Sequence, residues 1–206
     1  KQWGVPFEKI SKSIISRVPI LKNEYSPSWY GSEKYQGIPS HGYTHMLSNM
    51  LNGIKVNLGI SPKEYLKIKS DLTIYTGKID EYYNFCYGRL PYRSLKFEHT
   101  ITEDRLVHHA INECNKNVSY TRIYDHSYFL GQKETLTVIT KEYPIDYNNN
   151  IPFYPIVFGD GLELYKKYKL LADNEKNVIF LGRLATYKYL DMWVAIKQAM
   201  IKIKKI

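Results

Sequence analysis

Arginine and aromatic side chains that could bind an anionic ligand recur along this sequence beside glycine, proline or strand-like residues. Arg183 follows an apolar run and a glycine, and Arg122 lies in the alternating segment YTRIYDH. A guanidinium group forms paired hydrogen bonds with phosphate oxygens, and a tyrosine offers a flat apolar ring with one hydroxyl. Such groups suit a nucleotide sugar, which carries two phosphate charges, a stackable base and a hydroxyl-rich ring. The other residues of this kind are Trp3, Trp29, Tyr30, Arg89, Arg93 and Tyr154.

Each of these residues also has a purely structural interpretation. Arg122 could form a salt bridge on a sheet surface, Tyr154 could pack in the core, and the tryptophans could anchor loops. The corner at Gly182 and Arg183 has the same two alternatives. A glycine after a buried strand lets a ligand approach the backbone, and free N–H groups at a following helix favour anions. Alternatively, Arg183 caps the corner through a salt bridge to an acidic neighbour.

The composition is that of a globular protein with an excess of positive charge and of tyrosine. Of its 206 residues, 44% are hydrophobic, and the net charge is +9 with 20 tyrosines. This charge indicates either an anionic partner or lysines on solvated faces. We expect no nucleic-acid partner, because the sequence has no helix-turn-helix, RNP-type or zinc motif.

Cysteine usage and apolar runs bear on the compartment. Cys86 and Cys114 make no disulfide or metal framework, so we expect reduced thiols in the core of a cytoplasmic protein and no bound metal. No apolar run approaches ~20 residues, so we expect no membrane insertion. The sequence begins KQWGVPFEKI, without a methionine or a signal peptide, and we therefore expect a piece of a longer chain.

The elements that must position these residues follow from hydrophobic periodicity. Alternation over 92–103, 106–114, 119–128 and 134–144 predicts four strands with short connections, typical of an antiparallel meander. The segment 54–60 also alternates like a strand. Helical patterns are found at 5–16, 44–53, 61–70, 81–88, 161–175 and from 183 to the terminus, with strands at 71–76 and 177–181.

These patterns predict an α/β protein of the α+β kind. A central antiparallel sheet of about four to six strands has flanking helices, and a further strand and helix follow at the C-terminal end. In the last helix, five residues recur at helical spacing and are expected to face the core. They are Tyr189, Met192, Trp193, Ile196 and Met200.

The order of eight short motifs resembles that of UDP-galactopyranose mutases. The motifs are KQWG, KYQGIPSHGYTHML, IYTGKIDEYY, GRLPYRSLKFE, SYTRIYDHSYF, KEYP, PFYPI and GRLATYKYLDM, and they cover essentially the whole chain. The chain resembles the C-terminal half or so of such an enzyme. The resemblance implies a mobile-loop and helical segment at 1–20, a substrate-binding sheet domain at 21–150, and the C-terminal part of the FAD-binding domain at 151–206.

The resemblance implies an isomerase that interconverts UDP-galactopyranose and UDP-galactofuranose for the synthesis of galactofuranose-containing glycans. FAD is the cofactor and must be reduced. In that family, flavin N5 is thought to attack the anomeric carbon and expel UDP. The ring then opens, recloses as a furanose and is recaptured by UDP. The protein mainly positions groups and stabilises charge in such a mechanism.

The resemblance also assigns roles to single residues by motif position. Arg17, on a mobile loop, and Arg122 are expected to bind the diphosphate and to stabilise the charge of the departing UDP. The remaining assignments are Tyr30, Tyr154 and Tyr189 as phenol partners of the diphosphate, Trp3 at the sugar end, Asn112 near sugar and flavin, Arg93 as a further substrate residue, and Gly182, Arg183, Asp191 and Met192 at the flavin.

The sequence departs from the family pattern at three places, one of which is Asn112-Glu113, where the family often has Asn-Tyr. After TRI the family usually has Glu-His-Lys-His-Phe, whereas residues 124–129 read YDHSYF, which indicates a divergent member. No G-x-G-x-x-G fingerprint follows a strand, so the ADP-binding βαβ unit and much of the FAD site should lie upstream of residue 1. We therefore expect the isolated chain to be inactive.

Two alternatives stay open beside a mutase. One is a fragment or paralogue that binds a nucleotide sugar without chemistry, which the missing βαβ unit favours. The other is a flavoprotein of another class, such as an amine-oxidase-like enzyme, which would not need the diphosphate arginines. A homodimer is a further expectation, since dimers are common in bacterial members of the family.

Overall fold

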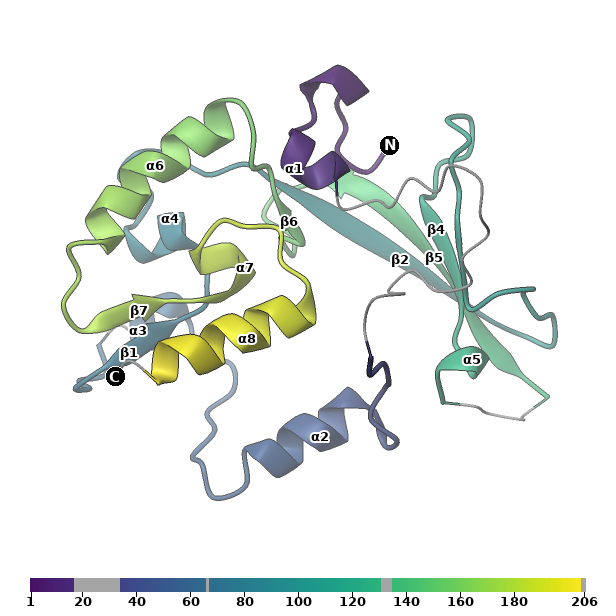
Figure 1. The fold of residues 1–206 in the computed structure, drawn as a ribbon, viewed down its shortest axis with the longest axis horizontal. Coiled ribbons are helices and arrows are strands. Elements are labelled where there is room, and N and C mark those ends of the chain that lie inside the picture. The colour runs from purple at the N-terminus through teal and green to yellow at the C-terminus, as the bar shows by residue number, and fades with distance from the viewer. Residues whose placement is uncertain (17–33, 66, 131–134, 205–206) are drawn as a thin grey trace. The chain divides into compact units, whose positions relative to one another are not determined.

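The computed structural model describes residues 1–16, 34–65, 67–130 and 135–204. It is a mixed α/β protein in which helices flank two separate sheets (Figure 1). One sheet has five strands and is antiparallel, and the other has two parallel strands. The predicted fold class, with a central antiparallel sheet of about four to six strands, is therefore confirmed.

The elements are short apart from two strands and three helices. The strands are β1 (Thr73–Tyr75), β2 (Tyr92–Thr102), β3 (Ala110–Asn112), β4 (Arg122–Asp125), β5 (Thr137–Asp146), β6 (Tyr154–Pro155) and β7 (Val178–Phe180). The helices are η1 (Phe7–Lys9), α1 (Lys12–Ile15), α2 (Gly42–Met50), α3 (Pro62–Tyr65), α4 (Ile79–Tyr82), α5 (Ser127–Leu130), α6 (Asp160–Ala172), α7 (Gly182–Ala185) and α8 (Met192–Ile203).

Contacts within the chain divide it into two compact units, each discontinuous in sequence. The contiguous segments 1–20, 21–150 and 151–206 inferred from the resemblance are a functional division of another kind, and they stay a prediction. Unit 1 takes Lys1 and the described residues within 12–58 and 96–143, and unit 2 takes those within 2–11, 59–95 and 144–206.

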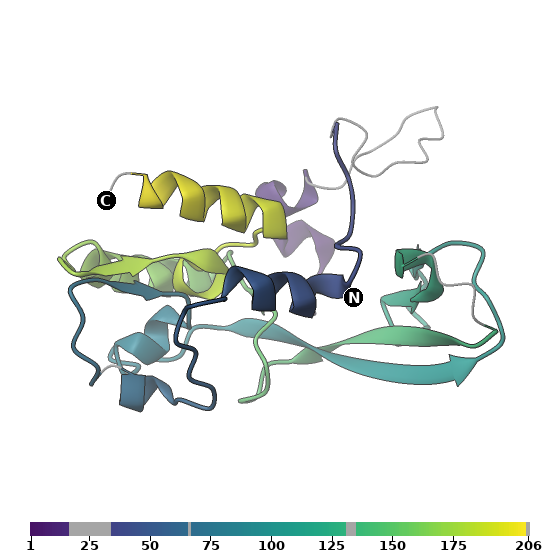
Figure 2. The same cartoon turned by 90° about the horizontal axis from the view of Figure 1, so that it is seen from below.

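The five-stranded sheet has the strand order β3-β4-β5-β2-β6. All four strands predicted between residues 92 and 144 form, as β2 to β5. The predicted antiparallel meander is wrong, however, because β2 lies beside β5 and not beside β3. The two longest strands, of 11 and 10 residues, are thus neighbours, and Figure 2 shows their twist in teal and green.

The parallel sheet brings two turns to one edge. Tyr75 of β1 lies opposite Phe180 of β7, and the Leu181 N–H donates to the Tyr75 carbonyl at 3.0 Å. Because both strands end at the same edge, the glycines that follow them, Gly77 and Gly182, lie on neighbouring turns. The predicted strand-to-helix corner at Gly182 is therefore next to a second glycine turn.

Several local predictions are wrong, among them the helix over 81–88, because α4 ends at Tyr82. Residues 54–60 form no strand, and η1 with α1 replaces one helix over 5–16. The C-terminal helix is divided into α7 and α8, because Tyr187 adopts a left-handed conformation with φ +47°. The buried Tyr187 hydroxyl donates to the Pro91 carbonyl at 2.6 Å, 96 positions away. This tertiary bond overrides the local helical spacing.

The core of unit 2 is built largely from tyrosines. Tyr92, Tyr168 and Tyr187 are at most 3% exposed and pack with Ile79 and Leu90. The Tyr168 hydroxyl donates to the Gly88 carbonyl at 2.6 Å and accepts from the Tyr87 N–H at 3.0 Å. Several of the 20 tyrosines thus combine an apolar ring with an internal hydrogen bond and are not available to a ligand.

The apolar stripe of α8 does not face the core. Met192, Trp193, Ile196 and Met200 are each more than half exposed, so that prediction is wrong for these four side chains. Cys86 and Cys114 are free, as expected, but both are exposed and do not lie in the core.

Two further observations concern membrane-spanning helices and metal-binding groups in the described part of the chain. No helix there is both long enough and apolar enough to cross a bilayer. No group of three histidine, cysteine, aspartate or glutamate side chains there could hold a metal ion.

Candidate functional site

An aromatic cluster in unit 2 brings together three of the predicted site residues. Trp3 is 8% exposed, and its ring centroid lies 5.9 Å from Tyr154 and 5.7 Å from Tyr189. The Tyr154 and Tyr189 rings are 5.3 Å apart, and Phe158 packs edge-on against Trp3 at 5.9 Å. Edge-to-face packing of this kind orients each ring. The cluster therefore holds two phenols at fixed positions beside one indole.

Arg183 fixes the two segments that carry these phenols, the start of β6 and the residues between α7 and α8. Its Nη1 donates to the Phe153 carbonyl at 2.9 Å, and its Nη2 donates to the Leu190 carbonyl at 2.5 Å. The guanidinium also lies 5.4 Å from the Tyr154 ring and 5.0 Å from the Tyr189 ring, within range of cation–π attraction. Arg183 therefore positions Tyr154 and Tyr189, and its contact with a flavin stays a prediction.

Arg93 holds the loop that carries Trp3. Its Nε donates to the Gln2 carbonyl at 3.1 Å, and its guanidinium pairs with Asp146. Gly4 packs on the same guanidinium, since a Cβ there would lie 3.0 Å from Nη1, and its φ of +66° favours glycine. The Arg93 side chain is buried in these contacts. Its observed role is to position the Trp3 loop, and direct substrate contact by Arg93 stays a prediction.

A cavity of about 610 Å³ opens beside this loop in unit 2. Its walls combine the indole of Trp3 with charged and amide groups, a mixture that suits a sugar or a nucleotide more than a purely apolar ligand. Its lining includes Trp3, Arg89, Tyr92, Arg93, Asp146 and Asn149.

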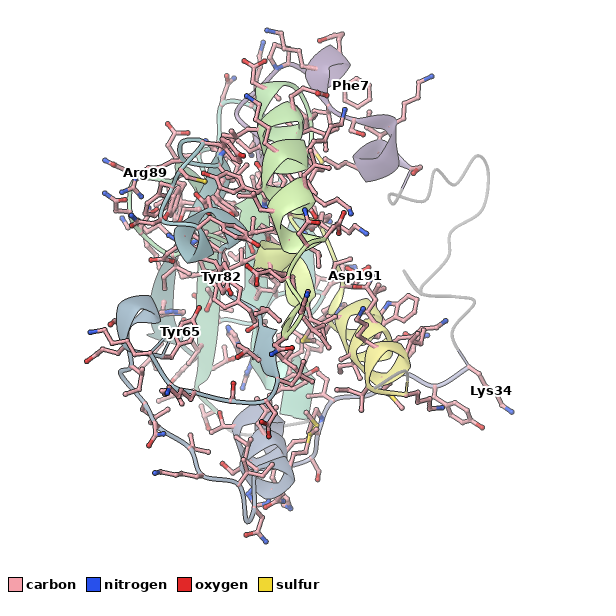
Figure 3. All side chains as sticks on the ribbon, turned by 90° about the vertical axis from the view of Figure 1, so that its left-hand side faces the viewer. Phe7, Lys34, Tyr65, Tyr82, Arg89 and Asp191 are labelled. Atoms are coloured by element: carbon pink, nitrogen blue, oxygen red, sulfur yellow. The ribbon has the colours of Figure 1, made fainter. Side chains whose placement is uncertain are left out.

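A second cavity of unit 2, of about 470 Å³, is lined by Tyr65 and Tyr82, both labelled in Figure 3, and by Lys67 and Lys69. The Tyr65 hydroxyl is buried there and has no hydrogen-bond partner among the described residues. Burial raises the pKa of Tyr65 to about 12, so this phenol stays protonated near neutral pH. No residue predicted for the site lies in this cavity.

The corner after β7 has the geometry that close approach of a flat ligand requires. Gly182 has φ +81°, and a Cβ there would find only the Thr76 side chain, at 3.8 Å. Asp191 is the N-cap residue of α8, where Figure 3 labels it, and its side chain makes no capping bond. Met192 begins that helix and is 65% exposed. The backbone at Gly182 thus fits one part of a flavin site.

In unit 1, a hydrogen-bonded row of side chains crosses three strands around Arg122. Asn112 of β3 and Glu142 of β5 are its register partners on either side. Arg122 Nε donates to the Asn112 side-chain oxygen at 2.7 Å, and Arg122 Nη1 donates to the Tyr124 hydroxyl at 2.9 Å. The Tyr124 hydroxyl in turn donates to Glu142 Oε2 at 2.9 Å. The predicted residues Arg122 and Asn112 are therefore in direct contact.

The electrostatics of this row keep Tyr124 neutral. Burial raises the pKa of Tyr124 to about 12; Arg122 opposes the rise and the Glu142 carboxylate adds to it. Glu142 is itself buried, and Thr121 also donates to it. The arrangement presents one guanidinium on a rigid sheet and can bind an anion.

Some site residues could not be placed, and others were missed. Arg17 and Tyr30 lie outside the described residues. Tyr124, Glu142 and Asp146 were not predicted as site residues. Alternation places residues 122 and 124 on one face of a strand, which could have indicated Tyr124. No local pattern indicates the two acids, because their partners are distant in sequence.

Comparison with known proteins places these features in a family. A family model described as UDP-galactopyranose mutase matches residues 1–189. The chain is 37% identical, over 97% of its length and 53% of the relative's, to a probable UDP-galactopyranose mutase of Klebsiella pneumoniae. It is 35% identical to a dTDP-fucopyranose mutase of Escherichia coli, over 97% of the chain and 56% of the relative. It is 32% identical to a UDP-galactopyranose mutase of Mycoplasma genitalium, over 100% of the chain and 55% of the relative. The chain thus spans about half the length of the curated relatives that it matches.

Proposed function

The chain belongs to the UDP-galactopyranose mutase family, and on that premise we propose that it forms the substrate-binding portion of an isomerase that interconverts UDP-galactopyranose and UDP-galactofuranose. The observation that carries the proposal is the row Asn112–Arg122–Tyr124, which holds a guanidinium by two hydrogen bonds of 2.7 and 2.9 Å. A guanidinium fixed in this way suits a diphosphate.

In this proposal the residues of the chain bind, orient and stabilise charge. Negative charge grows on UDP as its bond to the sugar breaks, and Arg122 stabilises that charge more as it develops. Arg17, outside the described residues, is the second such arginine and acts from a loop that closes over the substrate. Trp3 lies at the sugar end, and Tyr154 and Tyr189, whose rings pack against it, are phenol partners of the diphosphate.

The cofactor in this proposal is FAD, held in part by Gly182, Arg183, Asp191 and Met192. The fit rests on the open backbone at Gly182 and on the adjoining turn at the end of β1. The chemistry that reduced FAD supplies when bound is a nucleophile for the anomeric carbon. On the same premise we assign the enzyme to the cytoplasm, as a homodimer that serves the synthesis of galactofuranose-containing glycans.

One comparison favours a second substrate. The relative from Escherichia coli is named a dTDP-fucopyranose mutase, and its identity of 35% is close to the 37% of the Klebsiella protein. The same diphosphate chemistry serves either nucleotide sugar. We therefore keep a dTDP-sugar as the alternative substrate, and a non-catalytic nucleotide-sugar-binding role as the alternative function.

The proposal is tested on the purified 206-residue chain by an ultraviolet–visible spectrum before and after addition of FAD, with UDP and dTDP titrated in parallel. We expect UDP to bind, and Arg122→Ala to weaken that binding by about tenfold or more. Lys96→Ala is the control, because this exposed cation of the same unit pairs only with the neighbouring Glu98 among the ion pairs described. Tighter binding of dTDP would select the alternative substrate.

Two results would count against parts of the proposal. Absence of UDP and dTDP binding, with FAD present, would remove the substrate assignment. Equal binding by wild type and Arg122→Ala would remove Arg122 from the site.

A further inference from the structure

One cavity of unit 2 has no occupant in the proposed function. It measures about 610 Å³, and its walls come mainly from the loop of Trp3 and from residues 89–93 and 146–149. Of the aromatic cluster, neither Tyr154 nor Tyr189 is among the described residues that line it. A cavity of this volume holds a small organic ligand. The chemistry of its walls decides which ligand fits.

The charges in these walls leave Arg89 without an acidic partner. Arg93 pairs with Asp146, so those two charges offset each other. Arg89, labelled in Figure 3, belongs to no ion pair among the described residues. The cavity therefore carries one uncompensated positive charge. A guanidinium in this setting binds an oxygen anion such as a phosphate group.

The turn before Arg89 holds its guanidinium through an aromatic ring. The guanidinium carbon lies 4.1 Å from the centre of the Phe85 ring, within range of cation–π attraction. Phe85 has φ +57°, which is uncommon for a residue other than glycine, and its N–H donates to the Asp80 carbonyl at 2.7 Å. A guanidinium whose face contacts a ring still donates its N–H groups within its own plane. The contact thus orients Arg89 and leaves these donors to a ligand.

Tyr92 belongs to the same walls and has a buried hydroxyl without a partner. The residue is 3% exposed, and its hydroxyl forms no hydrogen bond with the described residues. Burial raises the pKa of Tyr92 well above its ordinary value, so this hydroxyl has a proton to donate at neutral pH. Buried hydroxyls are normally hydrogen-bonded, and an exception calls for an explanation. An oxygen of a ligand, reached directly or through one water, supplies the acceptor.

Amide groups and an indole complete the walls. The side chains of Asn148 and Asn149 are exposed and form no hydrogen bond within the described part of the chain. An amide both donates and accepts, as the hydroxyls of a sugar do. Trp3 adds apolar surface for the ring of such a ligand. These groups suit a hexose, and Arg89 suits a phosphate group on it.

We propose that this cavity is a binding site for a hexose phosphate, in which Arg89 binds the phosphate group and the Tyr92 hydroxyl donates to an oxygen of the ligand. The site goes beyond the proposed function, because it uses neither the Arg122 row nor the corner at Gly182. Trp3 is the residue that it shares with the aromatic cluster.

The test titrates the purified 206-residue chain with α-D-galactose 1-phosphate, inorganic phosphate and galactose by calorimetry, each with and without saturating UDP. We expect the hexose phosphate to bind at least about tenfold more tightly than either inorganic phosphate or galactose, and UDP to leave that affinity within about twofold. Arg89→Gln should weaken hexose phosphate binding by about tenfold. Lys166→Gln is the control, because it makes the same change of charge at an exposed lysine of α6 that pairs with Glu163.

Tyr92→Phe separates a ligand contact from a structural role. The hydroxyl has no partner in the free chain, so its removal should not lower the melting temperature. The same variant should bind the hexose phosphate about fivefold more weakly, because the ligand loses one hydrogen bond. Unchanged affinity in Tyr92→Phe would remove its hydroxyl from the site.

Three results would overturn the site itself. They are equal binding by wild type and Arg89→Gln, a hexose phosphate affinity no greater than that for inorganic phosphate, and displacement of the hexose phosphate by UDP, which would assign it to the nucleotide-sugar site. If the chain binds no UDP, the proposed function fails on its own. The comparison of wild type with Arg89→Gln then still decides whether the cavity binds a hexose phosphate.

Discussion

Replacement of Asp125 by asparagine should destabilise unit 1 by about 3 kcal/mol, because this buried carboxylate joins three segments of the unit. Asp125 Oδ1 accepts from the hydroxyls of Thr137 and Ser127, both at 2.7 Å, and from the Ser127 N–H at 3.1 Å. Asp125 Oδ2 accepts from the Leu106 N–H at 3.1 Å. The residue is fully buried, so no solvent replaces a lost bond.

The magnitude follows from these four bonds. In the variant, the amide oxygen replaces Oδ1 and keeps three donors, but hydrogen bonds to a charged acceptor are about twice as strong as neutral ones. We assign about 0.5–1 kcal/mol of loss to each of the three. The amide NH₂ replaces Oδ2 and meets the Leu106 N–H, two donors facing each other, for about 1 kcal/mol more.

The same carboxylate predicts a pH dependence of stability. Burial alone would raise the pKa of Asp125, but the bonds from Thr137, Ser127 and Leu106 outweigh it and hold the pKa well below its ordinary value. A carboxyl with a lowered pKa in the folded state stabilises the fold above its unfolded pKa of about 3.9. That contribution begins to decrease below about pH 4 and is lost as the pH falls through the lowered pKa of the folded state.

Urea unfolding at pH 7 and at pH 3 checks both statements. We expect the difference in unfolding free energy between wild type and Asp125→Asn to be about 3 kcal/mol at pH 7 and smaller at pH 3. Asp104→Asn is the matched control, because it makes the same change of charge at an exposed position nearby. A difference at pH 7 no larger than that of the control, or one that grows on acidification, would refute the reasoning.

Two further substitutions probe the packing of unit 2. Gly161→Ala should lower the melting temperature, with a loss of about 2 kcal/mol in unfolding free energy, because a Cβ would lie 2.7 Å from the Ile156 carbonyl oxygen. Alanine is the better helix former, so a higher melting temperature would contradict this packing. Tyr168→Phe should cost about 1–2 kcal/mol in urea unfolding, because the Gly88 carbonyl and the Tyr87 N–H both lose the phenol as a partner. An unchanged midpoint would mean that water replaces the hydroxyl.

Local periodicity and motif order predicted several strands, the corner at Gly182 and the family of this protein. The alternation of residues 92–144 predicted β2 to β5, and the apolar run 177–181 predicted β7. The corner at Gly182 was indicated by a glycine after a strand, and its positive φ agrees with that choice of residue. The order of eight motifs identified the family that the comparisons confirm. Each of these signals resides in neighbouring residues or in their sequence order.

Other features depended on partners far away in the sequence. The Arg93 bond to the Gln2 carbonyl joins residues 91 positions apart, and the Tyr187 bond to Pro91 joins residues 96 apart. The first holds the loop that carries Trp3, while substrate contact by Arg93 stays a prediction, and the second lies at the break in an expected helix.

The hydrogen bonds of Tyr124 to Arg122 and Glu142 depend on both local pattern and tertiary pairing. Alternation placed Arg122 and Tyr124 on one face of a strand, but only the pairing of β4 with β5 brought Glu142 opposite them. Periodicity reports which face a side chain takes, because it depends on backbone geometry. Strand neighbours and register depend on which distant segments pack together, and tertiary structure alone decided them.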